Sequence, residues 1–171
     1  MDVRVNVERG ELADVPGAQA VLAEARQWLA DRSIDQWRDP LPDRVIEEDV
    51  RRGRLFVVRA DGGLAGMLSI AHSDEDTWGP DSARALYVHR LAVAHRYRGA
   101  QLGRKLLRWA RTYALDRGCE WLRLDCAADN PGLRRFYERV GFAYVRDEIV
   151  PSPDGRRSFR VSLYQLAVEE I

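Results

Sequence analysis

Residues 85–107 read ALYVHRLAVAHRYRGAQLGRKLL, and the elements that they predict decide the fold. The part from Ala85 to Val93 is apolar on both faces, which is typical of a central strand. A loop with two glycines, Gly99 and Gly103, follows, and an amphipathic helix is expected over residues 99–117. Free N–H groups at a helix start and glycines for close backbone approach are suited to phosphate. The stretch therefore predicts a strand–loop–helix unit that binds phosphate.

Positive charge gathers at the same place. No Asp or Glu lies between Ser82 and Leu115, whereas the loop and helix carry several cations. These are Arg96, Arg98, Arg104, Lys105, Arg108 and Arg111. The alternative is a capped helix with a solvated basic face. The patterns GxxxxGK[ST] and GxGxxG are absent, so neither a Walker loop nor a dinucleotide fingerprint is indicated.

The segments before this unit predict a strand, two helices and a hairpin, from alternation, cap residues and the turn Asp61-Gly62-Gly63. They span residues 3–7, 15–30, 41–52, 55–58 and 64–71. The segments 31–40 and 73–82 read as irregular, and the second is acidic.

The segments after it predict a strand over 121–125, a helix from Asn130-Pro131 to Gly141, and strands over about 142–150 and 158–168. The order βααβββαβαββ indicates an α/β (α+β) fold in which residues 1–171 form a single domain.

Composition limits the partners. The 171 residues are 46% hydrophobic and 32% charged with a formal net charge of zero, which fits a soluble globular protein. Nothing in this balance favours nucleic acid or a membrane surface, and a homodimer is compatible with it. No apolar run has the length of a membrane span, and the start MDVRVNVERGE does not read as a signal peptide, so a cytoplasmic location is expected. Cys119 and Cys126 form no metal-binding pattern, and no metal is expected.

Two motifs resemble the GNAT superfamily of acetyl-CoA-dependent N-acetyltransferases. The first is the family pattern [QR]-x-x-G-x-[GA], matched by Arg96 and Gly99, although Gln101 replaces the last small residue. The second lies over 130–142 and is matched by Asn130, Leu133, Phe136, Tyr137, Glu138, Arg139, Gly141 and Phe142. The resemblance implies a mixed, mostly antiparallel central sheet flanked by helices, with acetyl-CoA as cosubstrate.

The resemblance also implies the acetyl-CoA contacts. Backbone groups of the strand would pair with pantetheine, N–H groups of the loop would hold the pyrophosphate, and Asn130 would bond the pantetheine arm unless it is only a helix cap. The implied set is Leu91, Ala92, Val93, Arg96, Arg98, Gly99, Ala100, Gln101, Leu102, Gly103, Arg104, Asn130 and Tyr137.

The catalytic groups implied by the family are Tyr137 and His89. Tyr137 stands where family members place the tyrosine that protonates the CoA sulfur; its alternative is a tyrosine packed in the core. The usual acidic position on the central strand is Tyr87 here, so His89 is the candidate base, against a structural buried histidine. Other candidates are His72, Glu75, Asp76 and a water-mediated route. Cys126 is read as a small buried thiol rather than a nucleophile.

The acceptor site is expected between residues 33–37 and 149–159. Trp28 and Trp37 would form its walls, and Asp35, or else Glu47 or Glu48, would receive a cationic amine; the alternative is loop anchors and a solvated helix face. Three functions remain open: an N-acetyltransferase for a small-molecule amine, one for proteins, peptides or aminoacyl-tRNA, and a non-catalytic acyl-CoA sensor.

Overall fold

A computed structural model describes residues 5–99, 101–152 and 155–169. Its strands form one seven-stranded sheet in the order β1-β2-β3-β4-β5-β7-β6. The strands are β1 Val7–Arg9, β2 Leu55–Ala60, β3 Gly63–Ala71, β4 Ala85–Val93, β5 Trp121–Ala127, β6 Ala143–Pro151 and β7 Ser158–Ala167. The helices are η1 Leu12–Asp14, α1 Val15–Ala30, α2 Asp43–Arg51, α3 Glu75–Trp78, η2 His95–Tyr97, α4 Leu102–Leu115 and α5 Pro131–Val140.

Pairing within the sheet is mostly antiparallel, as expected. The tight β2–β3 turn has positive φ at Asp61 and Gly62, the geometry of a hairpin turn that matches strand twist. Only β4 and β5 run parallel among the described strands.

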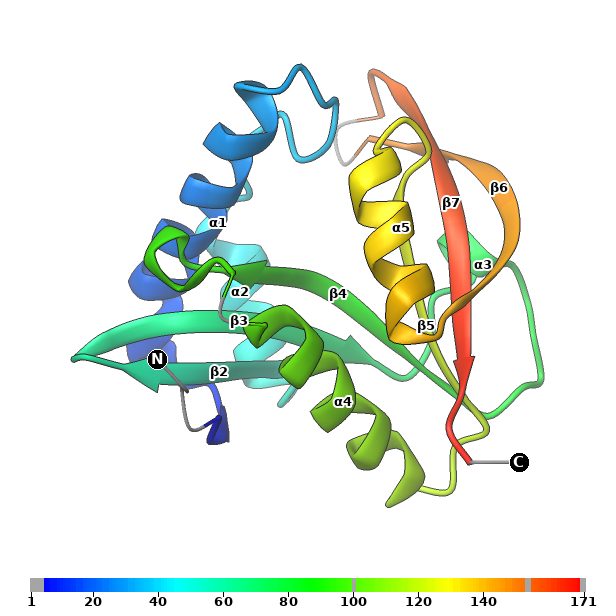
Figure 1. Cartoon of the computed structure of the whole chain (residues 1–171), viewed down its shortest axis with the longest axis horizontal. Coiled ribbons are helices and arrows are strands. Elements are labelled where there is room, and N and C mark those ends of the chain that lie inside the picture. The colour runs from blue at the N-terminus through cyan, green and yellow to red at the C-terminus, as the bar shows by residue number, and fades with distance from the viewer. Residues whose placement is uncertain (1–4, 100, 153–154, 170–171) are drawn as a thin grey trace.

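Strands β4 and β5 pair with each other at one end only. Pairing covers Ala85–Tyr87 against Trp121–Arg123, and the two strands then diverge, as Figure 1 shows. The later part of β4 therefore has no strand beside it on that side. This divergence creates space in the middle of the molecule, next to residues 88–93.

Helices cover the sheet on both sides. In Figure 1 α4 lies in front of the sheet and α2 behind it, while α1 contacts β3 and β4 and α5 contacts β6. The amphipathic face of α4 buries Leu102, Leu106 and Leu107 in the main core. Full burial of such a side chain contributes roughly 1.5–3 kcal/mol, so this packing fixes the helix start against the sheet.

Most predicted ranges differ from the observed ones by a few residues at their ends, and three differences are larger or concern the site. The first strand is Val7–Arg9 rather than 3–7, because residues 7–9 are the ones that pair with β2; residues 1–4 lie outside the described ranges. Helix α4 begins at Leu102 and not at Gly99, because Gly99 and Gln101 have φ of 83° and 57°, which no right-handed helix contains. The acidic segment 73–82 contains the short helix α3, which buries Trp78 against Tyr87.

No helix within the described residues is long and apolar enough to cross a lipid bilayer.

Candidate active site

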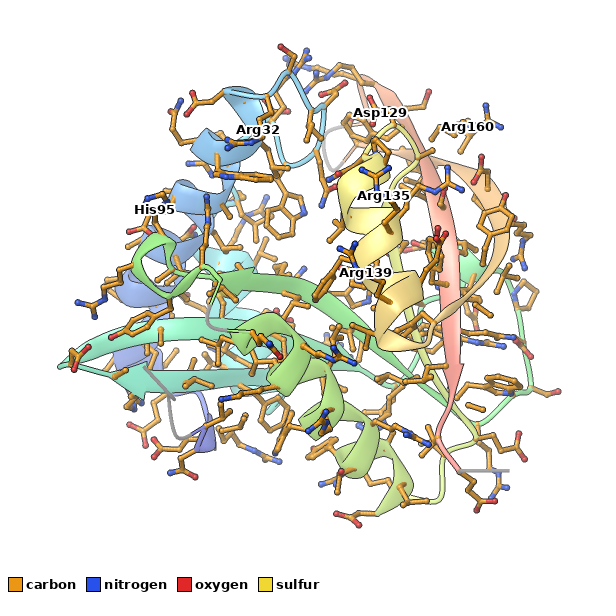
Figure 2. The ribbon with its side chains drawn as sticks, in the orientation of Figure 1. Arg32, His95, Asp129, Arg135, Arg139 and Arg160 are labelled. Atoms are coloured by element: carbon orange, nitrogen blue, oxygen red, sulfur yellow. The ribbon has the colours of Figure 1, made fainter. Side chains whose placement is uncertain are left out.

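A cavity of about 760 Å³ opens where β4 and β5 diverge. Its walls come from α1, the loop 35–42, the second half of β4, the end of β5, α5, and the outer ends of β6 and β7. Figure 2 shows Arg32 at the α1 side and Asp129 near the start of α5 on the other side, with side chains filling the region between these elements. Segments that are distant in sequence thus meet around one space.

Most of the residues predicted for the site surround this cavity. Its lining includes Trp28, Asp35, Trp37, His89, Leu91, Ala92, Val93, Arg98, Gly103, Asn130 and Tyr137. Arg96, Gly99, Gln101, Leu102 and Arg104 are not part of the lining, and Ala100 lies outside the described residues. The α1–loop wall and the β6–β7 wall also bring segments 33–37 and 149–159 to the same cavity.

The start of α4 is built to leave backbone N–H groups free. Gln101 is the N-cap residue in a left-handed conformation and makes no side-chain cap bond. The first N–H groups of a helix have no partner within the helix and carry the positive end of its dipole. The side chain of Leu102 belongs to the core, so this residue offers only its N–H group to a ligand.

Arg98 differs from the other loop cations. Its Nη1 is buried without a hydrogen-bond partner in the described structure, and burial lowers the pKa of its guanidinium. Its Nη2 donates to the Glu24 carbonyl at 3.3 Å, and its guanidinium lies 5.1 Å from the Trp28 ring. Arg96 instead donates to the Ala60 carbonyl at 3.3 Å, beside the β2–β3 hairpin. Arg98 is therefore the loop cation that faces the cavity.

Tyr137 is 5% exposed and contributes to the cavity wall. Its ring packs against those of Phe136, Phe142 and Tyr164 at centroid distances of 5.5, 5.9 and 6.1 Å. Burial raises the pKa of its hydroxyl well above the usual range, and the nearby thiol and carboxyl on β5 act in the same direction. The described residues make no hydrogen bond to this hydroxyl, and its raised pKa keeps it protonated at neutral pH.

Asn130 caps helix α5, which is the role that the sequence offered as the alternative to a contact with pantetheine. Its Oδ1 accepts from the Leu133 N–H at 3.1 Å, and its Nδ2 donates to Gln36 Oε1 at 3.4 Å. Gln36 also accepts from the Ala127 N–H at 3.4 Å. Gln36 was not anticipated, because its link from the α1–α2 loop to β5 has no local sequence signal.

Three titratable groups meet at the β4–β5 divergence. His89 Nε2 lies 3.5 Å from Asp74 Oδ2, and one ligand-type atom from each of Asp74, His89 and Asp125 lies within 4.8 Å of the others. Burial lowers the pKa of His89 against the opposing effect of Asp74, so the imidazole is neutral near pH 7. Burial, with a further effect from Asp74, raises the pKa of Asp125 to about 6.

Asp74 and Asp125 were missed as site residues. Asp125 could have been found, because it is an acid inside the otherwise apolar segment Leu124–Ala127 of a buried strand. Asp74 has no such signal, since it is one of several acids in an exposed loop. The trio is also the group that could hold a metal ion, but tetrahedral zinc with bonds of about 2.0–2.1 Å places its ligands only about 3.3 Å apart.

Two other positions on these strands have structural roles. Burial, followed by the charge of Asp125, raises the pKa of the Cys126 thiol to about 12, so it is neutral and a poor nucleophile. Tyr87, at the family's acidic position, lies in a second apolar cluster outside the cavity lining, and its hydroxyl accepts from Arg123 Nη1 at 3.2 Å.

The acceptor side of the cavity is aromatic and partly charged. Trp28 stacks against Arg32 at 3.9 Å, and Asp35 forms an ion pair with Arg38 at 3.0 Å. Glu47 and Glu48 do not contribute to the lining; they pair with arginines on the exposed face of α2, the alternative left open by the sequence.

An ion pair connects the two walls of the acceptor side. Arg157 Nη2 lies 2.6 Å from Asp39 Oδ2, which joins the α1–α2 loop to the start of β7 across 118 positions of sequence. We call this pair the Arg157–Asp39 strap. Asp39 belongs to the cavity lining, whereas Arg157 does not.

Comparisons with known proteins agree with this architecture. Residues 22–142 match the model of the Acetyltransferase (GNAT) family. The uncharacterized N-acetyltransferase YesJ of Bacillus subtilis is 32% identical over 140 residues, covering 77% of this chain and 78% of that protein. Streptothricin acetyltransferase of Streptomyces lavendulae is 33% identical over 97 residues, covering 57% of this chain, and the match spans about half, 48%, of that relative.

Solved structures share the fold. A GNAT-family acetyltransferase from Streptococcus agalactiae superposes with a TM-score of 0.78 at 22% identity, over 99% of both chains.

Proposed function

The chain belongs to the GNAT family of acetyltransferases, and from that premise we propose that it transfers an acetyl group from acetyl-CoA to a primary amine of a small molecule. The observation that carries the proposal is the cavity itself. It brings a protonated phenol without a hydrogen-bond partner among the described residues, a neutral imidazole and the cationic loop before α4 around one space.

The residues at the start of α4 fit the pyrophosphate of acetyl-CoA. An uncapped helix start offers N–H groups, and Arg98 supplies a cation whose buried Nη1 has no hydrogen-bond partner within the described structure. The side of β4 left free beyond Tyr87 offers backbone groups at Leu91 and Val93 to the pantetheine arm. When bound, acetyl-CoA supplies an acetyl thioester, so a C–N bond forms at its carbonyl carbon as the C–S bond breaks.

Tyr137 is proposed as the proton donor to the leaving sulfur. Its hydroxyl stays protonated because burial disfavours the phenolate, and it has no competing hydrogen bond to a described residue. A proton from its Oη stabilises a thiolate as that thiolate forms.

His89 is proposed to help remove the proton from the acceptor. A lysine-like amine has a pKa of ~10.4 and arrives protonated, so it cannot attack until a base takes a proton. His89 is neutral because of its burial and faces the cavity, so its imidazole can accept one.

The Arg157–Asp39 strap favours a small acceptor over a peptide. A polypeptide substrate needs a groove that is open along its length, whereas the strap crosses between the two segments that border the acceptor side. Trp28, Trp37 and Asp35 would then contact the acceptor. The name of the Streptomyces relative, an acetyltransferase of the small molecule streptothricin, points in the same direction.

The test is CoA release with a panel of small amines, amine-containing antibiotics and peptides. We expect turnover with small amines, and replacement of Tyr137 by Phe should lower kcat roughly 100-fold or more while the KM for acetyl-CoA changes little. The matched control is Tyr144→Phe, which removes a hydroxyl from an exposed tyrosine on β6. Unchanged turnover in Tyr137→Phe would remove this residue from the mechanism.

Two results would favour the other functions. Acetyl-CoA binding without turnover of any amine indicates a sensor. Turnover of peptides or aminoacyl-tRNA alone indicates a macromolecular acceptor.

A further inference from the structure

Asp74, His89 and Asp125 come from three separate elements and form one chain of polar atoms. Asp125 and His89 line the cavity, whereas Asp74 is not part of the lining and lies behind His89. Asp74 precedes α3 in a segment whose neighbours His72, Glu75 and Asp76 are exposed. The chain therefore leads from the cavity to the solvent-facing loop 72–76.

The distances are short enough for proton transfer directly or through a single water. A water that accepts or donates two hydrogen bonds of about 2.8 Å at a tetrahedral angle bridges atoms about 4.6 Å apart. The atoms of the trio lie within 4.8 Å of one another, and His89 and Asp74 are 3.5 Å apart. Each pair of neighbouring groups can therefore form a hydrogen bond after a small side-chain movement, or can be bridged by a single water.

The unsatisfied Oδ2 of Asp74 is a second, independent observation on this cluster. The atom is buried and makes no hydrogen bond within the described structure, and the Asp74 side chain is only 11% exposed. An acceptor left unpaired in the interior costs free energy, roughly 1–3 kcal/mol, unless a donor reaches it at some stage. The nearest donor-capable atom given for it is His89 Nε2.

We propose that Asp125, His89 and Asp74 form a proton relay that carries the acceptor's proton out of the cavity to the loop 72–76. The proposal rests on the acetyltransferase function and adds two residues to it. Asp125 and His89 meet the acceptor or its bridging water. Asp74 acts only through His89: it orients the imidazole and receives the proton from it.

The protons balance. An ammonium that becomes an amide gives up two protons. One of them replaces, in the overall balance, the proton that Tyr137 donates to the leaving sulfur. The other passes from Asp125 and His89 to Asp74 and then to solvent. No oxidant, reductant or metal is required.

The charges around the relay define its pH dependence. The imidazole is faced by Asp74, Arg90, Asp49 and Arg54, and Asp125 is faced by Asp74 and by the Cys126 and Tyr137 side chains. The charge of Asp74 raises the pKa of His89 more than that of Asp49 does, so neutralising Asp74 should lower that pKa further.

The first experiment follows His89 by ¹⁵N NMR titration in wild type, Asp74→Asn and Asp76→Asn. We expect Asp74→Asn to move the His89 titration to lower pH and to change its tautomer ratio. The control variant, in which an exposed acid of the same loop is neutralised, should leave both unchanged. If the pKa and the tautomer ratio of His89 are the same in Asp74→Asn as in wild type, the relay is overturned.

The second experiment measures amine acetylation against pH in the full chain. Asp74→Asn and Asp125→Asn should each lower kcat roughly 10- to 100-fold with the acetyl-CoA KM within about 2-fold, and the acidic limb of kcat/KM should move to lower pH in Asp74→Asn. Asp74→Glu should restore part of the rate, and Asp129→Asn, an exposed acid at the start of α5 labelled in Figure 2, should behave as wild type.

The remaining outcomes decide between alternatives. Loss of activity on chelation and its return with Zn²⁺ would overturn the relay in favour of a metal site. Normal rates in both Asp variants would also overturn it. Coupled NMR titration without turnover of any amine would support the cluster and overturn the acetyltransferase proposal, so the two failures are distinguishable.

Discussion

Two adjacent residues of β4, His89 and Arg90, belong to clusters of opposite character. Arg90 bonds to the buried Asp49 of α2 through Nε at 3.1 Å and through Nη2, and Asp49 also accepts from Ser69 Oγ at 2.6 Å. We call Asp49, Ser69 and Arg90 the closed cluster. Every charge in it has a partner of opposite sign or a hydrogen-bond donor.

The open cluster, Asp74, His89 and Asp125, lacks this compensation. It contains two carboxylates and one neutral imidazole, one carboxylate oxygen has no hydrogen-bond donor within the described structure, and the pKa of Asp125 is raised to about 6 by burial. Charges that are buried and unpaired are costly to stability, and such groups concentrate at functional sites. The comparison teaches that the chain compensates charge fully at Arg90 and leaves it uncompensated at His89, although both residues line the cavity.

A bulge in β4 separates the clusters. Arg90 has φ of 51°, and the β3–β4 register shifts between Met67 and Ser69, so one extra residue is inserted opposite β3. Neighbouring side chains on a regular strand would point to opposite faces. The bulge instead allows all of residues 88–93 to contribute to the cavity wall.

The largest effect on stability is expected from breaking the closed cluster. Asp49→Asn leaves the Arg90 guanidinium without its anion in a partly buried position, which should lower the free energy of unfolding by roughly 3–5 kcal/mol. Urea unfolding measures it. Glu48→Gln, which breaks an exposed pair on the same helix, is the control and should change stability by at most about 1 kcal/mol. Equal effects from the two variants would contradict the distinction.

Asp125→Asn should raise the free energy of unfolding, whereas Asp49→Asn should lower it. The raised pKa of Asp125 means that the folded state binds its proton more tightly than the unfolded state, whose carboxyl titrates near 3.9. Its contribution to stability is therefore present below pH ~4 and is lost as pH rises to about 6. Replacement by Asn should stabilise the protein by roughly 1–3 kcal/mol at pH 7.5.

The pH dependence is the control for that variant. The gain should shrink to near zero toward pH 4, where the carboxyl is protonated in the folded state and about half protonated in the unfolded state, and urea unfolding at both pH values tests this. A loss of stability that is the same at both pH values would show that Asp125 is a structural group like Asp49.

Ser69→Ala tests a weaker interaction within the closed cluster. It removes one hydrogen bond to Asp49 but leaves the ion pair with Arg90, so we expect a loss of about 1–2 kcal/mol by urea unfolding. Because Ser69 is outside the cavity lining, kcat should stay close to wild type. A large fall in kcat without unfolding would show that the closed cluster takes part in the reaction.

The smallest effect is expected at the Arg157–Asp39 strap, which belongs to neither cluster. The Asp39 side chain is 63% exposed, so solvent screens the pair, and Arg157→Gln should change stability by less than about 1 kcal/mol. The acceptor KM should rise a few-fold, while the acetyl-CoA KM stays constant. Faster turnover of peptides in this variant would confirm that the strap selects against them.

Much of the fold could be predicted from local patterns. Apolar residues on both faces identified β4 from Ala85 to Val93, and the Asn130-Pro131 signal identified the start of α5, both as observed. Local sequence failed where backbone geometry was decisive. The left-handed conformation of Gln101, which delays the start of α4, cannot be read from a residue that rarely adopts it.

The candidate site shows the same limit. Tyr137 and Asn130 came from motif positions and Arg98 from the cationic loop that contains the first motif, and all three line the cavity. Asp74, Gln36 and the Arg157–Asp39 strap depend on contacts between segments that are far apart in the chain, for which no periodicity or motif exists.

The sequence by itself therefore determined the order of elements, the family, and the positions of the phenol and the cationic loop. Each of these depends on short-range patterns of a few residues. The tertiary structure decided which charges are paired and which are not. Pairing depends on the bulge at Arg90 and on the divergence of β4 from β5, which place Asp49 against one residue and Asp74 and Asp125 against its neighbour.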